Sequence, residues 1–556
     1  MADQSPEERT LLTFLDAIDG EAEASRGKVD KGWDENIKLG RGEGQWKSTR
    51  PPLFLYNLIG NEIERKIARL TEAKPTYAVI SRLGHLSQMS KVLNATSRAI
   101  LEGEEFPLTM ERSARFGSYC GASIVSTVFD NTLPDGGDIR ITAWDNRAVY
   151  IDPSVTEAAK LSQQARYVRM DSVLSLDEIR QMFPGRGAFV APDTRYSRYR
   201  DMRGGRSTVS SVLNVLPRVL RPSEPARQGP IDRAILKEYW YRDPHTDKWP
   251  GGRHIFRAGD IVLKDEKNPY WDGEFPIDMV DWRMDVDSPW GMDDVRDLKK
   301  LNESMNRLGD GIMRNAMFAS QAWVIADQDA VDPEMWKKIT SEGGLIVRKR
   351  PTREFRRDPA PQLPGFLFQM LTTIPQFASH LTGNDEMVGG KGSKKGGAEG
   401  VIDGLQSAAS SMARVIARRY ESFVSRIGQK VISRIIQFYD EDRLLSYYDL
   451  NGELVNFLYE RDAIRYDDAG KIRGEELQGL SKKFRFVVQP YSSMASTKMQ
   501  RAQVSIGLWQ ASGGKGYPFK RVLEHADVGD PDALMQEARA ELQEGVVSPP
   551  QAPTKR

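Results

Sequence analysis

A proline-free helical pattern over residues 398–439 is the strongest constraint on the fold of this chain. Apolar side chains recur there at helical spacing, namely Val401, Leu405, Ala408, Met412, Val415, Phe423, Ile427, Val431, Ile435 and Phe438. At about 1.5 Å per residue, such a helix is roughly 60 Å long, far longer than the helices of an ordinary domain. The sequence therefore predicts one long helix that acts as an architectural beam.

Two further helical patterns precede the long helix. In residues 288–318, Ser288 can cap the helix and Pro289 suits its first position, with Asp293 and Asp294 in the first turn. A narrow apolar stripe follows on this otherwise polar helix and includes Leu298, Leu301, Met305, Leu308 and Ile312. Such a stripe is typical of packing against one neighbour. The second pattern, residues 364–381, is apolar enough to pack on several sides.

A compact unit lies between these two helices. The segments "AWVIA", "DPEMWKKIT" and "GGLIVRKR", the last ending at Arg350, predict a strand, a helix and a strand. Before residue 288, helical patterns cover residues 53–70, 87–102 and 110–120. The strands "ASIVSTVF" and "IRITAW" flank the turn "LPDGGD" and predict a hairpin, followed by the strand "AVYIDP". Residues 186–230 are rich in Gly, Arg, Ser and Pro and indicate an irregular insertion. The predicted fold class is α+β.

The glycine-rich stretch "TGNDEMVGGKGSKKGGAEG" could hold a nucleotide phosphate, but its spacing does not support that reading. A Walker A loop needs Ser or Thr after Gly-Lys, and Gly392 follows Lys391 here. The dinucleotide spacing G-x-G-x-x-G also fails, because Lys395 stands where the third glycine belongs. The composition instead predicts a flexible cationic loop whose Lys391, Lys394 and Lys395 touch a polyanion without specific contacts. A plain linker is the alternative.

No other pattern indicates catalysis. The five histidines are scattered, and Cys120, the single cysteine, lies beside a glycine with no obvious base. Asp285 and Asp287, or Asp293 and Asp294, could hold a divalent ion, although helix capping explains the second pair. The sequence thus predicts a protein that is not an enzyme and has no cofactor. No apolar run is long enough for a membrane span or a signal peptide.

The charge balance is close to neutral, with 79 lysines and arginines against 78 acidic residues. Such a balance argues against a protein that grips duplex DNA tightly. Two basic clusters stand out, one within residues 195–206 and one that contains Arg348, Arg350, Arg353, Arg356 and Arg357. The first is interpreted as solvated surface and a mobile loop, whereas the second fits a solvated surface and a nucleic-acid patch about equally well.

An ordered set of segments resembles the portal proteins of tailed bacteriophages. These segments are Trp33 and Trp46 before "PPLFLYNLIGNEIERKIARLTEAKPTYAV", then "RFGSYCGASIVSTVFD", "GDIRITAWDNRAVYIDP", "ARYVRMDSVLSLDEIRQMFP", "KEYWYRD", "SPWGMDDVRDLKKLNESMNRL", "FVVQPYSSMASTKMQRAQVSIGLWQASG" and "KRVLEHADVGDPDALMQEARAEL". Each segment is a weak signal alone, and their order over most of the chain carries the resemblance. Residues 186–230 do not match the pattern.

The resemblance implies a portal-like subunit layout. A mixed α/β wing would occupy residues 1–287, followed by a stem helix at 288–318, a small α/β clip at 319–362 and a second stem helix at 363–382. A tunnel loop would follow at 383–397, then the long helix and the rest of the wing at 398–489. A helical crown at 490–545 and a flexible tail at 546–556 would complete the chain.

The resemblance also implies a function and partners. Portal proteins form a closed ring, a dodecamer, at one capsid vertex, through which double-stranded DNA is packaged and ejected without sequence preference. The stem stripe would contact neighbouring subunits, and the three tunnel-loop lysines would line the DNA channel. The basic clip residues would dock the terminase large subunit or the head-to-tail adaptor. Capsid and scaffolding proteins would be further partners, in the virion and, during assembly, in the host cytoplasm. A shorter connector ring and a DNA-translocating motor enzyme are the alternatives.

Overall fold

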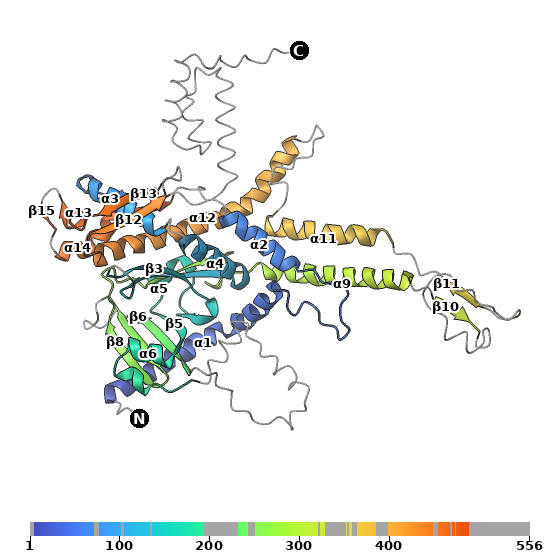
Figure 1. The fold of residues 1–556 in the computed structure, drawn as a ribbon, viewed down its shortest axis with the longest axis horizontal. Coiled ribbons are helices and arrows are strands. Elements are labelled where there is room, and N and C mark those ends of the chain that lie inside the picture. Colours follow the sequence, from blue (N-terminus) through green and yellow to red (C-terminus); the bar gives the residue numbers. More distant parts are fainter. Residues whose placement is uncertain are drawn as a thin grey trace, which may run out of the picture. The chain divides into compact units, whose positions relative to one another are not determined.

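The computed structural model describes residues 5–71, 77–101, 105–133, 136–193, 232–242, 249, 251–320, 323–327, 352, 355–358, 364–384, 399–448, 454–467, 470–472 and 474–488. The chain divides into two compact units (Figure 1). The first comprises Met1–Trp33, Ile67–Asp293 and Ala413–Arg556, and the second comprises Asp34–Lys66 and Asp294–Met412. Helices and antiparallel sheets are both present, which agrees with the predicted α+β class.

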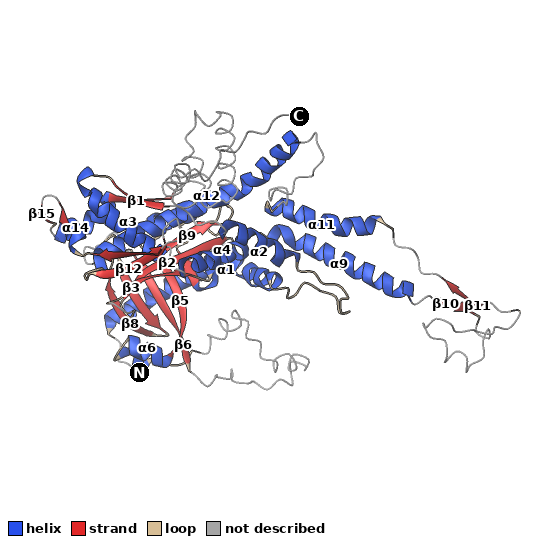
Figure 2. Cartoon of the chain, turned by 45° about the horizontal axis from the view of Figure 1, so that its top comes forward, coloured by secondary structure: helices blue, strands red, loops and turns tan. Residues whose placement is uncertain are grey.

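Two antiparallel sheets of three or more strands lie in the described part of the first unit (Figure 2). The larger has the strand order β4-β5-β6-β7-β8, with bounds Val149–Ile151, Tyr167–Ser175, Arg233–Tyr241, Arg253–Ala258 and Ile261–Lys267. The smaller has the order β3-β2-β9, with bounds Asp138–Ala143, Ala122–Asp130 and Ile277–Asp281. The predicted hairpin is confirmed, because β2 pairs with β3 from Val125 opposite Ala143 to Asp130 opposite Asp138.

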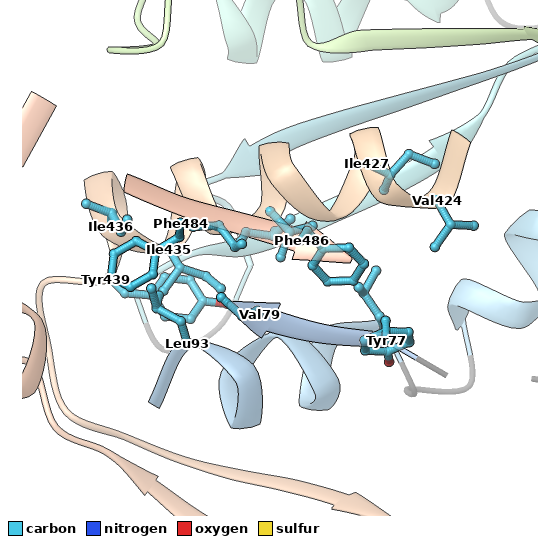
Figure 3. Close-up of a cluster of buried hydrophobic side chains, with 14 of the residues drawn as sticks. Tyr77, Val79, Leu93, Val424, Ile427, Ile435, Ile436, Tyr439, Phe484 and Phe486 are labelled. Carbon is cyan, nitrogen blue, oxygen red and sulfur yellow. The ribbon is translucent and has the colours of Figure 1, made fainter. Parts of the chain in front are cut away.

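The predicted long helix is confirmed as α12, Glu399–Phe438. Its part in the first unit carries the largest apolar core of the described residues, together with α3 (Ser87–Leu101) and the strands β1 (Tyr77–Ser81) and β16 (Phe484–Val488) (Figure 3). Ile427 and Ile435 of the helix are fully buried there.

Further helices and strands of the first unit are α4 Glu105–Cys120, α5 Leu161–Gln164, α6 Leu176–Met182, β12 Arg443–Tyr448, β13 Leu454–Tyr459, α13 Asp462–Arg465, β14 Tyr466–Asp467, β15 Gly470–Lys471 and α14 Gly474–Leu480.

A row of basic side chains on α12 pairs with carboxylates on and before β9. Arg419 lies 3.1 Å from Asp281, and Lys430 lies 2.8 Å from Asp278. Further along the helix, the guanidinium of Arg434 binds Asp272 and stacks on Tyr270, 3.4 Å from the ring centroid. These pairs are largely buried, so removal of one partner would leave an uncompensated charge. They fix the position of the long helix against the smaller sheet.

A helix that the sequence analysis missed, α1, spans Pro6–Gly40. The portion of α1 that belongs to the first unit is held in place by buried charged side chains. The Asp19 carboxylate accepts a hydrogen bond from the Arg169 guanidinium at 2.6 Å. Arg26 and Arg169 both stack on Tyr150, each 3.5 Å from the ring centroid. Burial raises the pKa of Asp19, but Arg169 and Lys237 outweigh burial and hold the pKa below its usual value. The carboxylate therefore stays ionised within this cluster.

The second unit contains an antiparallel pair of helices, α9 (Val295–Ser320) and α11 (Phe366–Thr382), called the stem hairpin below. The α11 helix confirms the predicted helix over residues 364–381. Between them lie the paired strands β10 (Trp323–Ala326) and β11 (Phe355–Asp358). The β10 strand was predicted, whereas the predicted helix and second strand through Arg350 lie outside the described residues.

The predicted start of the first stem helix at Ser288 is wrong, because α9 begins at Val295. Residues before it are held in a turn: Ser288 Oγ accepts from the Trp290 N–H at 3.3 Å, and Arg283 pairs with Met292 in an isolated bridge. Gly291 has a φ of +64°, and a Cβ there would lie 2.6 Å from the Gly121 carbonyl oxygen. The left-handed φ of Gly291 interrupts any helix that would start at Ser288, and the close approach to Gly121 leaves no room for a side chain at this position.

Candidate assembly surface of the stem

The α11 helix has no Asp, Glu, Lys or Arg along its whole length, Phe366–Thr382. Ile374 and Ala378 are buried, with 5% and 0% exposure. Another face stays open and exposes Phe366 (60%), Met370 (53%), Phe377 (58%) and Leu381 (48%). At 3.6 residues per turn these four side chains lie within about 60° of one another around the helix. They are called the outer α11 face.

The predicted apolar stripe on α9 has a role inside the subunit. Leu298, Met305 and Ile312 are buried by the single chain, with 0%, 6% and 8% exposure. Leu301 and Leu308 are half-buried. Since α9 packs against α11, the stripe contributes to the stem hairpin. A contact with a neighbouring subunit stays a prediction, for which the two half-buried leucines are the more accessible residues.

A second face of α9 binds the segment that leads into α2 (Leu58–Thr71), residues 51–58, called the strap. Three side chains at spacings of four residues accept backbone N–H groups of the strap. Asn302 Oδ1 accepts from Leu58 at 2.9 Å, Asn306 Oδ1 from Tyr56 at 2.7 Å, and Asp310 Oδ1 from Leu53 at 2.7 Å. We call these three residues the ladder. Residues i, i+4 and i+8 of a helix share one face, so the ladder fixes the strap along the helix axis.

Further contacts hold the far end of the strap. Arg314, one turn beyond the ladder, donates to Asp310 at 2.5 Å and to the Pro51 carbonyl at 2.6 Å. Gly309 lies under the ring of Phe54, and a Cβ at this position would lie 2.2 Å from Phe54 Cδ1. The sequence analysis missed this arrangement, and its predicted helix over residues 53–70 starts too early, because α2 begins at Leu58. The only local signal of the arrangement is the polar side chains spaced four residues apart on an otherwise amphipathic helix.

The end of α11 is tied to α2, Leu58–Thr71, through a buried carboxylate. Glu62 is 1% exposed and accepts from Ser379 at 3.0 Å, Thr382 at 3.2 Å and Asn384 at 3.1 Å. Asn384 also donates to the Glu62 backbone carbonyl at 2.7 Å. The helix itself ends at Gly383, which has a left-handed φ of 74°. The last turn of α11 therefore has a fixed position.

A buried ion pair lies at the start of α9. Lys66 Nζ lies 2.8 Å and 2.9 Å from the two carboxylate oxygens of Asp294, and both side chains are buried. Asp294, which the sequence analysis considered as a cation ligand, thus already faces an ammonium group. The pair connects α2 to the first turn of the stem hairpin.

The sequence of the chain was compared with models of known protein families. A model described as Phage P22-like portal protein matches residues 29–556 of the chain. The chain belongs to this portal protein family. The match includes α9, α11, the strap and the long helix, and it confirms the resemblance seen in the sequence. No curated protein matches the chain.

Membership makes the chain a bacteriophage portal protein, a head-to-tail connector with a role in genome packaging. Portal proteins are structural proteins, which agrees with the prediction that this chain is not an enzyme. The described residues contain no group of three or more His, Cys, Asp or Glu side chains that could hold a metal ion. Among the helices in the described ranges, none combines the length and hydropathy needed to cross a bilayer.

The predicted contact residues of the portal protein are only partly described. Lys391, Lys394 and Lys395 lie outside the described residues. So do the clip residues Arg348, Arg350 and Arg353. Arg356 and Arg357 belong to β11, where their backbones pair with Ile325 and Val324 of β10. The roles of these residues stay predictions.

Proposed function

We propose that this portal protein forms a closed ring, a dodecamer, whose central channel conducts double-stranded DNA during packaging and ejection. The observation that carries the ring is the uncharged α11 helix with its exposed outer face. Apolar side chains cover about half of the circumference of α11, and the single subunit buries only the part of this apolar face that contains Ile374 and Ala378. An apolar helix face is normally covered by another part of a protein, so the outer α11 face is expected to be buried in an assembly. Burial of the four half-exposed side chains against another subunit would contribute roughly 1 kcal/mol each.

The channel is proposed to hold DNA loosely. The glycine-rich stretch that follows α11 contains Lys391, Lys394 and Lys395, and the fixed end of α11 at Gly383 anchors its start. Lysines on a glycine-rich chain contact phosphates without reading bases, which suits DNA that must move. The near-neutral total charge of the chain fits weak and salt-sensitive contact.

The distal end of the stem hairpin is proposed as the docking site for the terminase large subunit and, later, the head-to-tail adaptor. Its strand β11 contains Arg356 and Arg357 and pairs with β10, and the sequence just before β11 contains Arg348, Arg350 and Arg353. The terminase would supply the energy for translocation. Capsid and scaffolding proteins would surround the ring at one vertex of the capsid, in the virion and in the assembling particle.

Negative-stain microscopy and sedimentation of the purified full chain test this proposal. A ring with a central hole is the expected result, together with DNA binding whose affinity falls with salt and does not depend on sequence. A chain that stays a compact monomer over all protein concentrations would contradict the proposal. The variant Phe377→Asp should lower the yield of rings, because it places a charge in the contact, whereas Arg307→Asp on the charged, exposed face of α9 should not.

A further inference from the structure

We propose that the ring contact of the stem is heterologous: the outer α11 face of one subunit packs on the strap of the next, against Leu53 and Leu55. This inference rests on the proposed ring and specifies which two surfaces form it. A cyclic ring needs two different, complementary surfaces on each subunit, since a contact between identical patches closes as a dimer. The described part of the second unit offers two such surfaces.

The strap is the second uncharged and exposed apolar surface. Residues 51–61 read "PPLFLYNLIGN" and contain no charged side chain. Leu53 and Leu55 are 43% and 52% exposed, whereas Phe54 packs over Gly309 of α9. The exposure of Leu53 and Leu55 on either side of Phe54 shows that α9 does not cover these two side chains. The strap thus presents a short apolar ridge to solvent.

The two surfaces lie on different sides of α9. Figures 1 and 2 both show α11 along one side of α9 and the chain that precedes α2 along the other. The residue positions agree with this view. Around a helix of 3.6 residues per turn, the ladder (Asn302, Asn306, Asp310) lies about 100° from the buried stripe (Leu298, Met305, Ile312). One subunit therefore presents the outer α11 face on one side and the leucine ridge on another.

The charges of α9 favour this pairing over a contact through α9 itself. From Arg296 to Arg307 the exposed surface of α9 carries Arg296, Asp297, Lys300 and Arg307, whereas its exposed apolar side chains, Met313 and Met317, lie beyond the ladder. If the uncharged α11 of the next subunit packed on these charged side chains, they would lose their contact with water and gain no hydrogen-bond or ion-pair partner. The strap offers α11 an apolar surface that the ladder already holds in place. Since the strap is ordered in the subunit, binding costs little additional conformational entropy.

Engineered cysteines can test this contact directly, because Cys120 is the single cysteine of the chain and is buried. In a Cys120→Ala background, Leu55→Cys subunits would be co-expressed with subunits that carry one of Met370→Cys, Phe377→Cys or Leu381→Cys. The two partners would carry different affinity tags, and rings would be verified by microscopy before oxidation. A disulfide forms only where the two Cβ atoms come within about 4.5 Å.

The expected result is a disulfide-linked dimer with both tags for at least one of the three pairs, and none when Leu55→Cys is paired with Leu444→Cys. Leu444 is 71% exposed on β12 and serves as the matched control. A subunit with both cysteines of the productive pair should give a ladder of multimers that ends at the closed ring.

Two results would overturn the inference while the proposed ring stands. Intact rings without a linked dimer for any of the three pairs would show that other surfaces meet. A linked dimer of Phe377→Cys with itself would show a contact between identical faces. Absence of rings from the Cys120→Ala protein and from the unaltered chain would instead contradict the proposed function, and the inference with it.

Discussion

Gly309 of α9 and Phe54 of the strap touch so closely that any side chain at position 309 would have to displace the Phe54 ring. The Cβ of an alanine there would lie 2.2 Å from Phe54 Cδ1, far below any normal contact. Glycine within a helix costs roughly 0.5–1 kcal/mol relative to alanine. The contact with the Phe54 ring is a structural reason for its presence in the middle of the stem.

We expect Gly309→Ala to displace Phe54 and to lower both the thermal unfolding midpoint and the yield of rings. Gly311 on the same helix is the matched control, because a Cβ there meets nothing within 4 Å. Gly311→Ala should be neutral or stabilise the helix by up to about 1 kcal/mol. The two variants would be compared by calorimetry and sedimentation. Equal effects of the two substitutions would refute a specific role for the Phe54 contact.

Asn306→Ala should release the middle of the strap. The Tyr56 N–H loses its acceptor, and an unsatisfied buried donor costs about 1–3 kcal/mol. Hydrogen exchange of the strap amides should become faster, with the largest change near Tyr56. Asn315→Ala, on the same helix but outside the ladder, is the control. Exchange rates at the strap that match those of the control would contradict the ladder as the source of its order.

The stability of the first unit should fall as pH rises through the raised pKa of His254. Its ring stacks on Trp240 with a centroid distance of 3.8 Å, and Nε2 lies 2.9 Å from Glu238. Burial lowers the pKa of His254, but hydrogen bonds to Glu238 and Glu266 outweigh burial and raise it above 6.5. Because the pKa of His254 is higher in the folded than in the unfolded protein, protonation of His254 stabilises the fold. This stabilisation is complete below the ordinary histidine pKa and is lost as pH rises through the pKa of the folded protein.

Thermal unfolding as a function of pH would measure this contribution. Over the range from about pH 6 to about pH 9, which includes the usual histidine titration, the wild-type midpoint should fall more steeply than that of His254→Gln. Lys264 pairs with Glu266 in the same cluster, so Lys264→Gln should change the slope far less. Parallel curves for wild type and His254→Gln would rule out this histidine as the source.

Replacement of Lys391, Lys394 and Lys395 by serine should leave ring assembly intact and impair packaging or retention of DNA. Each lost phosphate contact removes about one unit from the log–log dependence of DNA affinity on salt. The defect should be the same for DNA of any sequence. Genome length and DNA leakage would be measured in particles with the triple variant. Wild-type values for both would leave the stretch as a simple linker.

Charge reversal at Arg353, Arg356 and Arg357 should weaken terminase docking and reduce its dependence on salt. Exposed charges act mainly through long-range attraction, which salt screens over about 8–10 Å. Binding of the purified terminase large subunit to rings would be measured at several ionic strengths. Docking that keeps its wild-type strength and salt dependence would assign the contact to other residues.

Elements with a strong local pattern could be predicted from the sequence alone. The helices α3, α11 and α12 and the hairpin of β2 and β3 form where apolar side chains recur at regular spacing or a glycine turn separates two strands. The order of short segments along the chain also determined the family. These features depend on neighbours in sequence, so they remain visible without any tertiary contact.

Helix α1, the start of α9 and the ladder depend on tertiary contacts. Gly20, Gly27 and Gly32 weaken the helical pattern in the sequence of α1. The helix is stabilised instead by hydrogen bonds of Asp19 and Arg26 to residues of strands that are distant in sequence. The predicted start of α9 at Ser288 differs from the observed start at Val295, because Gly291 has a left-handed φ and lies against the backbone of Gly121. The ladder joins residues about 250 positions apart, and its asparagines look like ordinary polar residues of a helix. Hydrogen bonds between such distant residues exist only after the chain has folded, so no local pattern records them.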